Sequence, residues 1–170
     1  MAMEDLSIRP AVASDTDDLR RGLIALQEYE SALHDSRLPA AAVADPYLNW
    51  MLRQIAEQDG LCLVGRLADD FFGFAAGWIE RANNLTETED STAFGYISDI
   101  CILPAWRGRR LSAPLLVGIE RHFHARSVRR LRISSLDTNV AALAAYRSAG
   151  YSPYEITLEK VLKATASTYP

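Results

Sequence analysis

The segment CILPAWRGRRLSAPLL, residues 101–116, runs from an apolar, strand-like stretch into a helix-like one through three arginines and one glycine. Arg107, Arg109 and Arg110 surround Gly108 at this junction. A strand that leads through such a turn into a helix presents several unpaired backbone N–H groups, and the helix dipole adds roughly half a positive charge there. The junction therefore suits an anion, phosphate above all, although a solvated basic turn is an alternative that the pattern alone leaves open.

Charge is distributed unevenly along the chain. The net charge is −4, but residues 1–100 contain 18 acidic and 7 basic side chains, whereas residues 101–132 contain 8 arginines and a single acid, Glu120. Such asymmetry indicates either partners of opposite sign or salt bridges between the two parts of the chain, and charge alone favours neither.

Length and composition predict a single globular domain over residues 1–170. The chain is 49% hydrophobic and 24% charged, and no apolar stretch approaches the roughly 18 residues that a membrane helix needs. The first residues lack the pattern of a signal peptide. Cys62 and Cys101 lie in apolar runs, and neither they nor the histidines show metal-ligand spacing. We therefore expect free, buried thiols in a reducing, cytoplasmic location, with no metal and no membrane partner.

Hydrophobic periodicity predicts the order of strands and helices. Strands are expected at residues 6–11, 61–67, 71–81, 92–103, 130–137 and 151–162, and helices at residues 14–33, 47–60, 112–126 and 139–150. Ser14 or Asp15 is expected to cap the first helix, and residues 34–46 to be irregular. In this order an antiparallel meander precedes a β-α-β unit, which predicts a mixed, three-layer α/β domain.

Three parts of the chain resemble the GCN5-related N-acetyltransferase (GNAT) superfamily. YISDICILPAWRGRRLSAPLL (residues 96–116) looks like its core strand and the loop that binds the pyrophosphate of acetyl-CoA. LDTNVAALAAYRSAGY (residues 136–151) looks like its closing motif, including the seven-residue interval from Asn139 to Tyr146, and DDFFGFAAGWI (residues 69–79) resembles its hairpin strand. The resemblance implies the GNAT fold: a mixed, mostly antiparallel sheet of about six or seven strands, flanked by about four helices and splayed at the core strand.

The same resemblance implies an N-acetyltransferase that moves the acetyl group of acetyl-CoA to a primary amine by direct attack in a ternary complex. The acidic first hundred residues favour a cationic small molecule as the acceptor. Acetylation of a protein N-terminus or lysine, and a domain that senses acyl-CoA without turnover, stay open as alternatives. A homodimer, common in the superfamily, is open too. Nucleic acid is not expected, because Trp106 and Phe123 are the only aromatic residues among the arginines.

The phosphate loop departs from the superfamily pattern. The usual Arg/Gln-x-x-Gly-x-Gly/Ala reads RGRRLS here, so Arg110 and Ser112 stand at the glycine positions. Because backbone amides bind the pyrophosphate, a side chain at position 110 is compatible with binding while its φ stays negative. Pro114 fits only the first turn of a helix, which predicts a helix start near residues 111–113. The residues implied to bind acetyl-CoA are Ile100, Cys101, Ile102, Arg107, Gly108, Arg109, Arg110, Leu111, Ser112, Ala113 and Asn139.

Acetyl transfer to an amine needs a base for the ammonium proton and an acid for the departing thiolate. The resemblance implies Tyr146 as the acid, and Asp99 in the core strand is the candidate base. A tyrosine packed on the core, a structural acid, and a helix-capping role for Asn139 are the alternatives. Strict alternation places Tyr96, Ser98, Ile100 and Ile102 on one face of the strand and Ile97, Asp99 and Cys101 on the other, unless a bulge of the kind found in GNAT core strands intervenes.

The acceptor site is expected near the end of the first helix, which borders the acceptor pocket in the superfamily. The expected substrate-binding residues are Tyr29, Glu30, His34 and Ser98. Glu87, Glu89 and Asp90 in the acidic loop form a second cluster that fits a cation. Solvated side chains are the alternative for both clusters.

Overall fold

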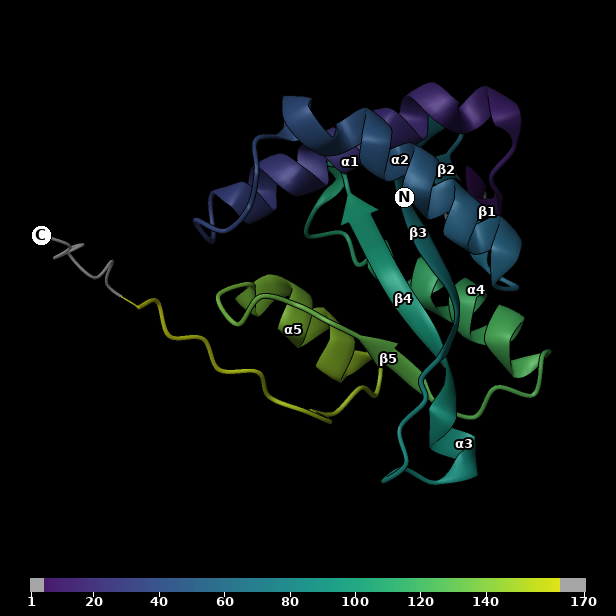
Figure 1. Ribbon diagram of the computed structural model, residues 1–170. Coiled ribbons are helices and arrows are strands. Elements are labelled where there is room, and N and C mark those ends of the chain that lie inside the picture. The colour runs from purple at the N-terminus through teal and green to yellow at the C-terminus, as the bar shows by residue number, and fades with distance from the viewer. Residues whose placement is uncertain (1–4, 163–170) are drawn as a thin grey trace, which may run out of the picture.

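The computed structural model describes residues 5–162, which form one mixed sheet covered by helices on both faces (Figure 1). The strands are β1 (Leu6–Pro10), β2 (Leu61–Leu67), β3 (Asp70–Arg81), β4 (Ala93–Ile102) and β5 (Leu131–Ile133). The helices are α1 (Thr16–Ser31), α2 (Ala40–Glu57), α3 (Glu89–Thr92), α4 (Ser112–His124) and α5 (Val140–Ser148), with 3-10 turns at Ala13–Asp15 and Pro104–Trp106. The strand order is β1-β2-β3-β4-β5, antiparallel except for the parallel pair β4–β5. The expected α/β fold is confirmed, with five strands rather than six or seven among the described residues.

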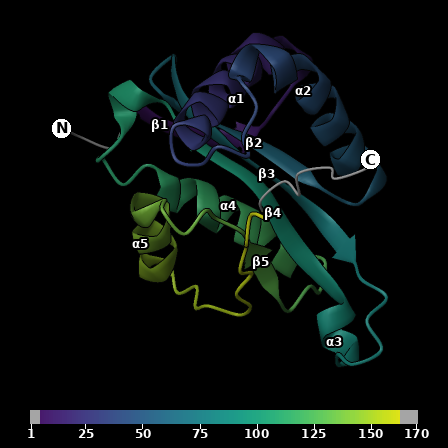
Figure 2. The same ribbon diagram turned by 60° about the vertical axis from the view of Figure 1, so that its left-hand side comes forward.

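The sheet separates two apolar cores. α1 and α2 cover one face, and α4 and α5 cover the other (Figure 2). The α1–α2 core includes Leu19, Leu23, Met51, Phe74 and Trp78. The α4–α5 core includes Phe72, Ile97, Leu115, Ile119 and Phe123. Each helix layer therefore contacts its own set of alternate strand residues, as expected for a three-layer domain.

One extra residue in β4 forms a β-bulge. Ala76 of β3 pairs with Asp99, but the next residue, Gly77, pairs with Ile97, so Ser98 has no partner in β3. Such a bulge shifts the alternation of the strand by one residue. The bulge implied by the resemblance is therefore present, and strict alternation through residue 98 is wrong.

The bulge decides which core each side chain of β4 faces. Tyr96, Asp99 and Cys101 face α1 and α2. Ile97, Ile100 and Ile102 face α4 and α5. Asp99 is thereby moved away from the face that it would share with Ile97 in a regular strand.

β4 and β5 are paired over only part of their length. The parallel register joins Gly95, Tyr96 and Ile97 to residues 131–133, and residues 98–102 have no partner in β5. Beyond this point the two strands diverge, as Figure 1 shows. The expected splay is present, and β5 is shorter than the strand predicted over residues 130–137 because the chain leaves the sheet there.

α2 begins at Ala40, inside the segment 34–46 that the sequence predicts to be irregular. Pro46 lies within this helix, where it removes one backbone hydrogen bond. Ala40, Ala44, Leu48 and Met51 are buried at helical spacing along one face, and packing of this face outweighs the proline. Neither α2 nor any other helix within residues 5–162 is long and apolar enough to cross a membrane.

The final strand predicted over residues 151–162 is not part of the sheet. This segment runs past α5 without regular pairing (Figures 1 and 2). Its large apolar side chains are exposed, namely those of Tyr154, Ile156, Leu158, Val161 and Leu162. The alternating pattern is typical of a strand, but no strand of the described chain pairs with it.

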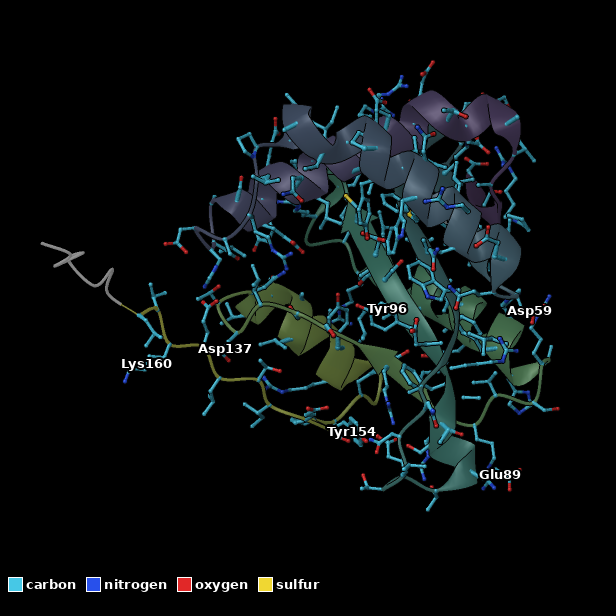
Figure 3. The ribbon with its side chains drawn as sticks, viewed as in Figure 1. Asp59, Glu89, Tyr96, Asp137, Tyr154 and Lys160 are labelled. Atoms are coloured by element: carbon cyan, nitrogen blue, oxygen red, sulfur yellow. The ribbon has the colours of Figure 1, made fainter. Side chains whose placement is uncertain are left out.

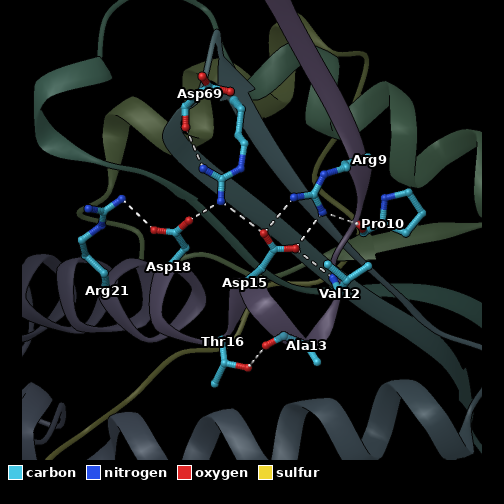
Figure 4. A network of polar contacts seen from close by, with 10 residues as sticks. Arg9, Pro10, Val12, Ala13, Asp15, Thr16, Asp18, Arg21 and Asp69 are labelled. Atoms are coloured by element: carbon cyan, nitrogen blue, oxygen red, sulfur yellow. Dashed lines mark hydrogen bonds and ion pairs between the residues drawn. The ribbon is translucent and has the colours of Figure 1, made fainter.

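Asp15, at the start of α1, is a buried carboxylate between two arginines (Figure 4). It accepts hydrogen bonds from Arg9 of β1 at 2.7 and 2.9 Å and from Arg66 of β2 at 3.2 Å. It also accepts the N–H of Val12 at 2.8 Å, and its side chain does not cap a helix N–H as the sequence predicts. The bond from Arg9, above all, holds the pKa of Asp15 well below its usual range. This network ties α1 to two strands.

Asp15→Asn is expected to lower the free energy of unfolding by about 1–3 kcal/mol at pH 7, because the arginines lose a buried charged partner. The folded-state pKa of the carboxyl is lowered, so its contribution is fully present above the unfolded pKa of about 3.9 and is lost as the pH falls below it. Urea unfolding at pH 7 and pH 3 measures this difference, which should shrink at the lower pH. Asp17→Asn, at an exposed position of the same turn, is the control, and equal losses in both variants would contradict the assignment.

Candidate active site

Asp99 is a buried carboxyl group at the bulge of β4. The residue is 7% exposed, and the hydroxyl of Tyr47 in α2 donates a hydrogen bond to its Oδ2 at 2.9 Å. Burial raises the pKa of Asp99 to about 6, and hydrogen bonding from Ser98 and then from Tyr47 acts in the opposite direction. At neutral pH this group is mostly ionised and still basic enough to accept a proton.

Tyr47 is positioned by a row of aromatic rings. Its ring centre lies 5.3 Å from that of Trp50, which in turn lies 5.3 Å from Trp78, and Trp78 lies 5.7 Å from Tyr96. Tilted and edge-to-face contacts of this kind restrict ring rotation. Burial and the neighbouring Asp99 raise the pKa of Tyr47, so its hydroxyl stays a hydrogen-bond donor.

Asp99 lies on the wall of a cavity of about 450 Å³ between α1, α2 and the chain that leaves β5. Tyr96, labelled in Figure 3, lies on the same wall below α1 and α2. The charged side chains of the lining are Glu30, Arg37 and Asp99, and the segment after β5 adds Ser134 and Ser135. A cavity of this size, with few charged groups among apolar ones, suits a small molecule.

Two of the four residues expected to bind substrate line this cavity. Glu30 and Ser98 lie in its wall, whereas Tyr29 and His34 do not. The Tyr29 ring lies under the guanidinium of Arg107, 4.6 Å from the ring centre. His34 lies beside the C-terminal segment, where its Nε2 is 3.4 Å from the Oε2 of Glu159.

The acidic loop lies at the other end of the molecule. Figure 3 shows Glu89 on α3, away from α1 and α2. Glu87 pairs with Arg132 at 2.9 Å, and Asp90 pairs with Arg130 at 3.1 Å. Part of the charge asymmetry is therefore satisfied by salt bridges within the chain, and these acids do not line the cavity.

Tyr146 lies in the α4–α5 core, on the face of the sheet opposite to α1 and α2. It is 9% exposed in the α4–α5 core, and its ring centre lies 6.3 Å from that of Tyr151. Burial, followed by the negative charges of Glu30 and Asp99, raises the pKa of Tyr146. The hydroxyl group is therefore protonated at neutral pH and lies within electrostatic reach of Asp99.

Asn139 caps α5 and joins it to α1. Its Oδ1 accepts the N–H of Ala142 at 3.2 Å, and the hydroxyl of Tyr29 lies 3.5 Å from the same oxygen. Arg107, stacked on Tyr29, donates from Nε to the carbonyl of Ile102 at 3.0 Å. The end of β4, the end of α1 and the start of α5 are thus connected beside the splay.

The turn before α4 has a left-handed backbone at two residues. Gly108 has φ +78° and Arg110 has φ +59°. The condition for a side chain at position 110, a negative φ, is therefore not met: the turn has a backbone that favours glycine, and a left-handed L-residue costs about 1–2 kcal/mol. α4 begins at Ser112 with Pro114 in its first turn, as predicted. Within the described chain, the backbone N–H groups of residues 108–111 have no acceptor.

The arginines of this turn differ in their surroundings. Arg109 lies over the ring of Trp106 at 4.8 Å. Arg107 lies over the ring of Tyr29 and donates to the carbonyl of Ile102. Arg110 is exposed and forms no ion pair with the described residues. The turn is therefore rich in both positive charge and free backbone donors, which is the donor set that a phosphate group requires.

The two cysteines are free and buried, as expected. The Sγ of Cys101 donates to the carbonyl of Gly22 at 3.2 Å, and burial raises the pKa of both Cys62 and Cys101 to about 12. A nucleophilic cysteine needs a lowered pKa, so neither thiol suits an acyl-enzyme route. Residues 5–162 contain no group of three or more histidine, cysteine or acidic side chains that could hold a metal ion.

Among the residues of this site that sequence reasoning missed are Tyr47 and Arg37. Tyr47 is 52 positions from Asp99 in the sequence, and Arg37 lies in the segment predicted to be irregular. No local pattern marks either residue, because both reach the site through the packing of α1 and α2. The only available signal was the proximity of Arg37 to the expected acceptor residues at the end of α1.

The sequence profile of the Acetyltransferase (GNAT) family matches residues 24–151. No curated protein sequence matches the chain at a significant level.

Solved structures of the same fold cover nearly the whole chain. A GCN5-related N-acetyltransferase from Ralstonia eutropha JMP134 has a TM-score of 0.72 at 20% identity, covering 92% of this chain and 98% of that chain. The aminoglycoside 6′-N-acetyltransferase AAC(6′)-IG from Acinetobacter haemolyticus has a TM-score of 0.67 at 21% identity, covering 94% and 99%. AAC(6′)-Iy, in complex with the bisubstrate analogue CoA-S-monomethyl-acetylneamine, has a TM-score of 0.66 at 16% identity, covering 94% and 99%. These similarities establish the fold, and the family profile, which spans most of the sequence, shows that the chain belongs to the GNAT family of acetyltransferases.

Proposed function

We propose that this acetyltransferase moves the acetyl group of acetyl-CoA to a primary amine of a cationic small molecule. The observation that carries the proposal is the position of Asp99. It is a buried carboxyl group with a pKa of about 6 that faces a cavity, at the bulge where β4 loses its pairing with β5. A base beside a cavity where the sheet opens is suited to an amine that attacks a thioester directly.

Three features support acetyl-CoA as the donor. The turn at Gly108 and Arg110 leaves backbone N–H groups free ahead of α4, whose dipole is positive at that end. Arg109 and Arg110 add exposed positive charge for the pyrophosphate. The unpaired edge of β4, residues 98–102, offers main-chain groups to the pantetheine arm, and Cys101 contributes only through its backbone because its thiol points to α1.

The proposed chemistry follows from Asp99 and Tyr146. The acceptor ammonium loses a proton to Asp99, directly or through water, and the neutral nitrogen then attacks the thioester carbonyl. As the C–N bond forms and the C–S bond breaks, the Tyr146 hydroxyl protonates the departing thiolate. The second proton that the nitrogen sheds restores the tyrosine, and Asp99 returns its proton to solvent. Main-chain N–H groups at the splay stabilise the oxyanion.

The cavity supports a small cationic acceptor. Its charged lining consists of Glu30, Arg37 and Asp99, so acids outnumber bases. Its volume of about 450 Å³ lies within the usual range for small-molecule sites. Two of the proteins of similar fold are, by name, aminoglycoside acetyltransferases, which is consistent with an amine-bearing small molecule.

A single domain over residues 1–170, a cytoplasmic location and a homodimer stay predictions. The free, buried thiols of Cys62 and Cys101 support a reducing compartment. The exposed apolar side chains of residues 154–162 support self-association, because exposed apolar stretches are typical of contact surfaces.

The first test is thiol release from acetyl-CoA against a panel of amines, for the wild type and for Tyr146→Phe. We expect release that depends on the amine and falls by about a hundredfold in the variant, because the thiolate loses its proton donor. Tyr151→Phe, which alters the neighbouring ring, is the control and should keep its activity. Acetyl-CoA binding without release would favour a sensor, and release only with protein substrates would favour a protein acetyltransferase.

Tyr47→Phe is expected to shift the pH dependence of kcat. Activity should fall below about pH 6, where Asp99 becomes protonated. The hydrogen bond from Tyr47 stabilises the carboxylate, so its loss raises the pKa of Asp99. The acidic limb should therefore move up by about one pH unit, with most activity regained at high pH. Tyr96→Phe, in the same cavity wall, should leave the limb in place, and an equal shift in both variants would contradict the role of Tyr47.

Arg110→Gly is expected to raise the free energy of unfolding by up to about 1 kcal/mol, because glycine adopts a positive φ without strain. It should also raise the KM for acetyl-CoA by about tenfold through loss of a guanidinium–phosphate contact. Urea unfolding and steady-state kinetics measure the two effects. Arg110→Ala loses the same charge without relieving the backbone, so it should show the change in KM alone. A lower free energy of unfolding for Arg110→Gly than for the wild type would contradict the assignment of backbone strain to Arg110.

A further inference from the structure

The ion pair between Glu30 and Arg37 lies in the wall of the cavity around Asp99. Glu30 belongs to the last turn of α1 and Arg37 to the loop that follows, and the Nε of Arg37 is 3.2 Å from the Oε2 of Glu30. Both side chains line the cavity, and neither is used in the proton transfers proposed above. One acid of the acceptor cavity is therefore already bound to a cationic group of the chain itself.

Glu30 occupies a position that favours a cation. The C-terminal end of a helix has a partial negative charge. The last turn of α1 contains Glu28 and Glu30 and no basic side chain. The charge of Glu30 also adds to the effect of burial in raising the pKa of Asp99 and Tyr146, so it lies within electrostatic reach of both. A cation at Glu30 offsets this accumulation of negative charge.

Arg37 is held more loosely than Glu30. Its side chain is 42% exposed, against 24% for Glu30, and it forms no other side-chain hydrogen bond within residues 5–162. The loop that carries it is anchored at the next residue, where the Nε2 of Gln27 donates to the carbonyl of Leu38 at 2.7 Å. The guanidinium is therefore free to leave Glu30 for solvent while the loop stays in place, since a pair this exposed contributes little to stability.

We propose that Glu30 binds a second ammonium group of the acceptor and that Arg37 occupies this position until such a group displaces it. The inference rests on the proposed function and narrows its substrate class to diamines and larger polyamines. One nitrogen is acetylated beside Asp99 while another pairs with Glu30. An acceptor with a carboxylate at its far end is disfavoured, because Glu30 and Asp99 give the lining a net negative charge.

The test uses carbon chains of three lengths, butane, pentane and hexane. For each length it compares three acceptors: the diamine, the amino alcohol and the amino carboxylate. They share the reacting amine and differ only in the charge of the far group. For the wild type, kcat/KM of the best diamine should exceed that of its amino alcohol by about tenfold to a hundredfold, the effect of one charge-assisted hydrogen bond. The amino carboxylate should be the poorest acceptor.

Variants separate the roles of the two residues. Glu30→Gln should raise the KM of the diamine by about tenfold or more and leave the amino alcohol within about twofold. Arg37→Gln should lower the KM of the diamine several-fold by removing the competitor, and the double variant should behave like Glu30→Gln. Glu28→Gln makes the same charge change at the same helix end outside the cavity, so it should alter none of the three acceptors.

Equal use of diamine and amino alcohol by the wild type would overturn the inference and leave the proposed function standing. A preference of the wild type for the amino carboxylate, lost in Arg37→Gln, would also overturn the inference, because Arg37 would then bind the carboxylate of the acceptor. No release with any amine would instead count against the proposed function. Calorimetric binding of the diamine to the wild type and to Arg37→Gln then decides the inference, which fails if the variant binds no more tightly.

Discussion

The site depends on Ser98, the one residue of β4 that has no partner in β3. Because Ser98 has no partner in β3, Asp99 lies against α2 and not beside Ile97 in the α4–α5 core. The bulge also begins where β5 stops pairing, so one irregularity both orients the acid and opens the sheet next to it. In a regular strand the same carboxyl group would be buried among the apolar residues of α4, where its ionised form is very unfavourable.

Much of the fold was predictable from short-range patterns, and the errors occur where packing overrides them. The start of α4 near Pro114, the hairpin of β2 and β3, the buried cysteines and the cap at Asn139 all follow local rules. The segment 34–46, which ends in Pro46, is predicted to be irregular, but packing of a buried face makes residues 40–46 part of α2. A side chain at position 110 is least strained at a negative φ, but the turn has Arg110 at a φ of +59°. Neither outcome is encoded in neighbouring residues alone.

The candidate site was predictable to the same extent. Asp99 stands out as an acid within an apolar strand, and Glu30 was placed by its position at the end of the first helix. Tyr47 and Arg37 could not be assigned, because their contacts depend on how α2 and the preceding loop fold over α1. The charge asymmetry had two explanations: salt bridges within the chain account for part of it, and a partner of opposite charge stays a prediction. Arg130 and Arg132 neutralise the acidic loop, whereas the arginines beside Gly108 remain exposed.

The sheet separates the two regions that the proposed function uses. The cavity around Asp99 is bounded by α1, α2 and the loop between them, while the turn at Gly108 leads into α4, which packs in the other core. We therefore expect substitutions in residues 32–39 to alter the wall of this cavity without disturbing the packing beneath the turn at Gly108. If the proposed function holds, this short loop is where evolution can change the preferred amine while the acetyl donor stays the same, and it is the segment to diversify in a directed-evolution library.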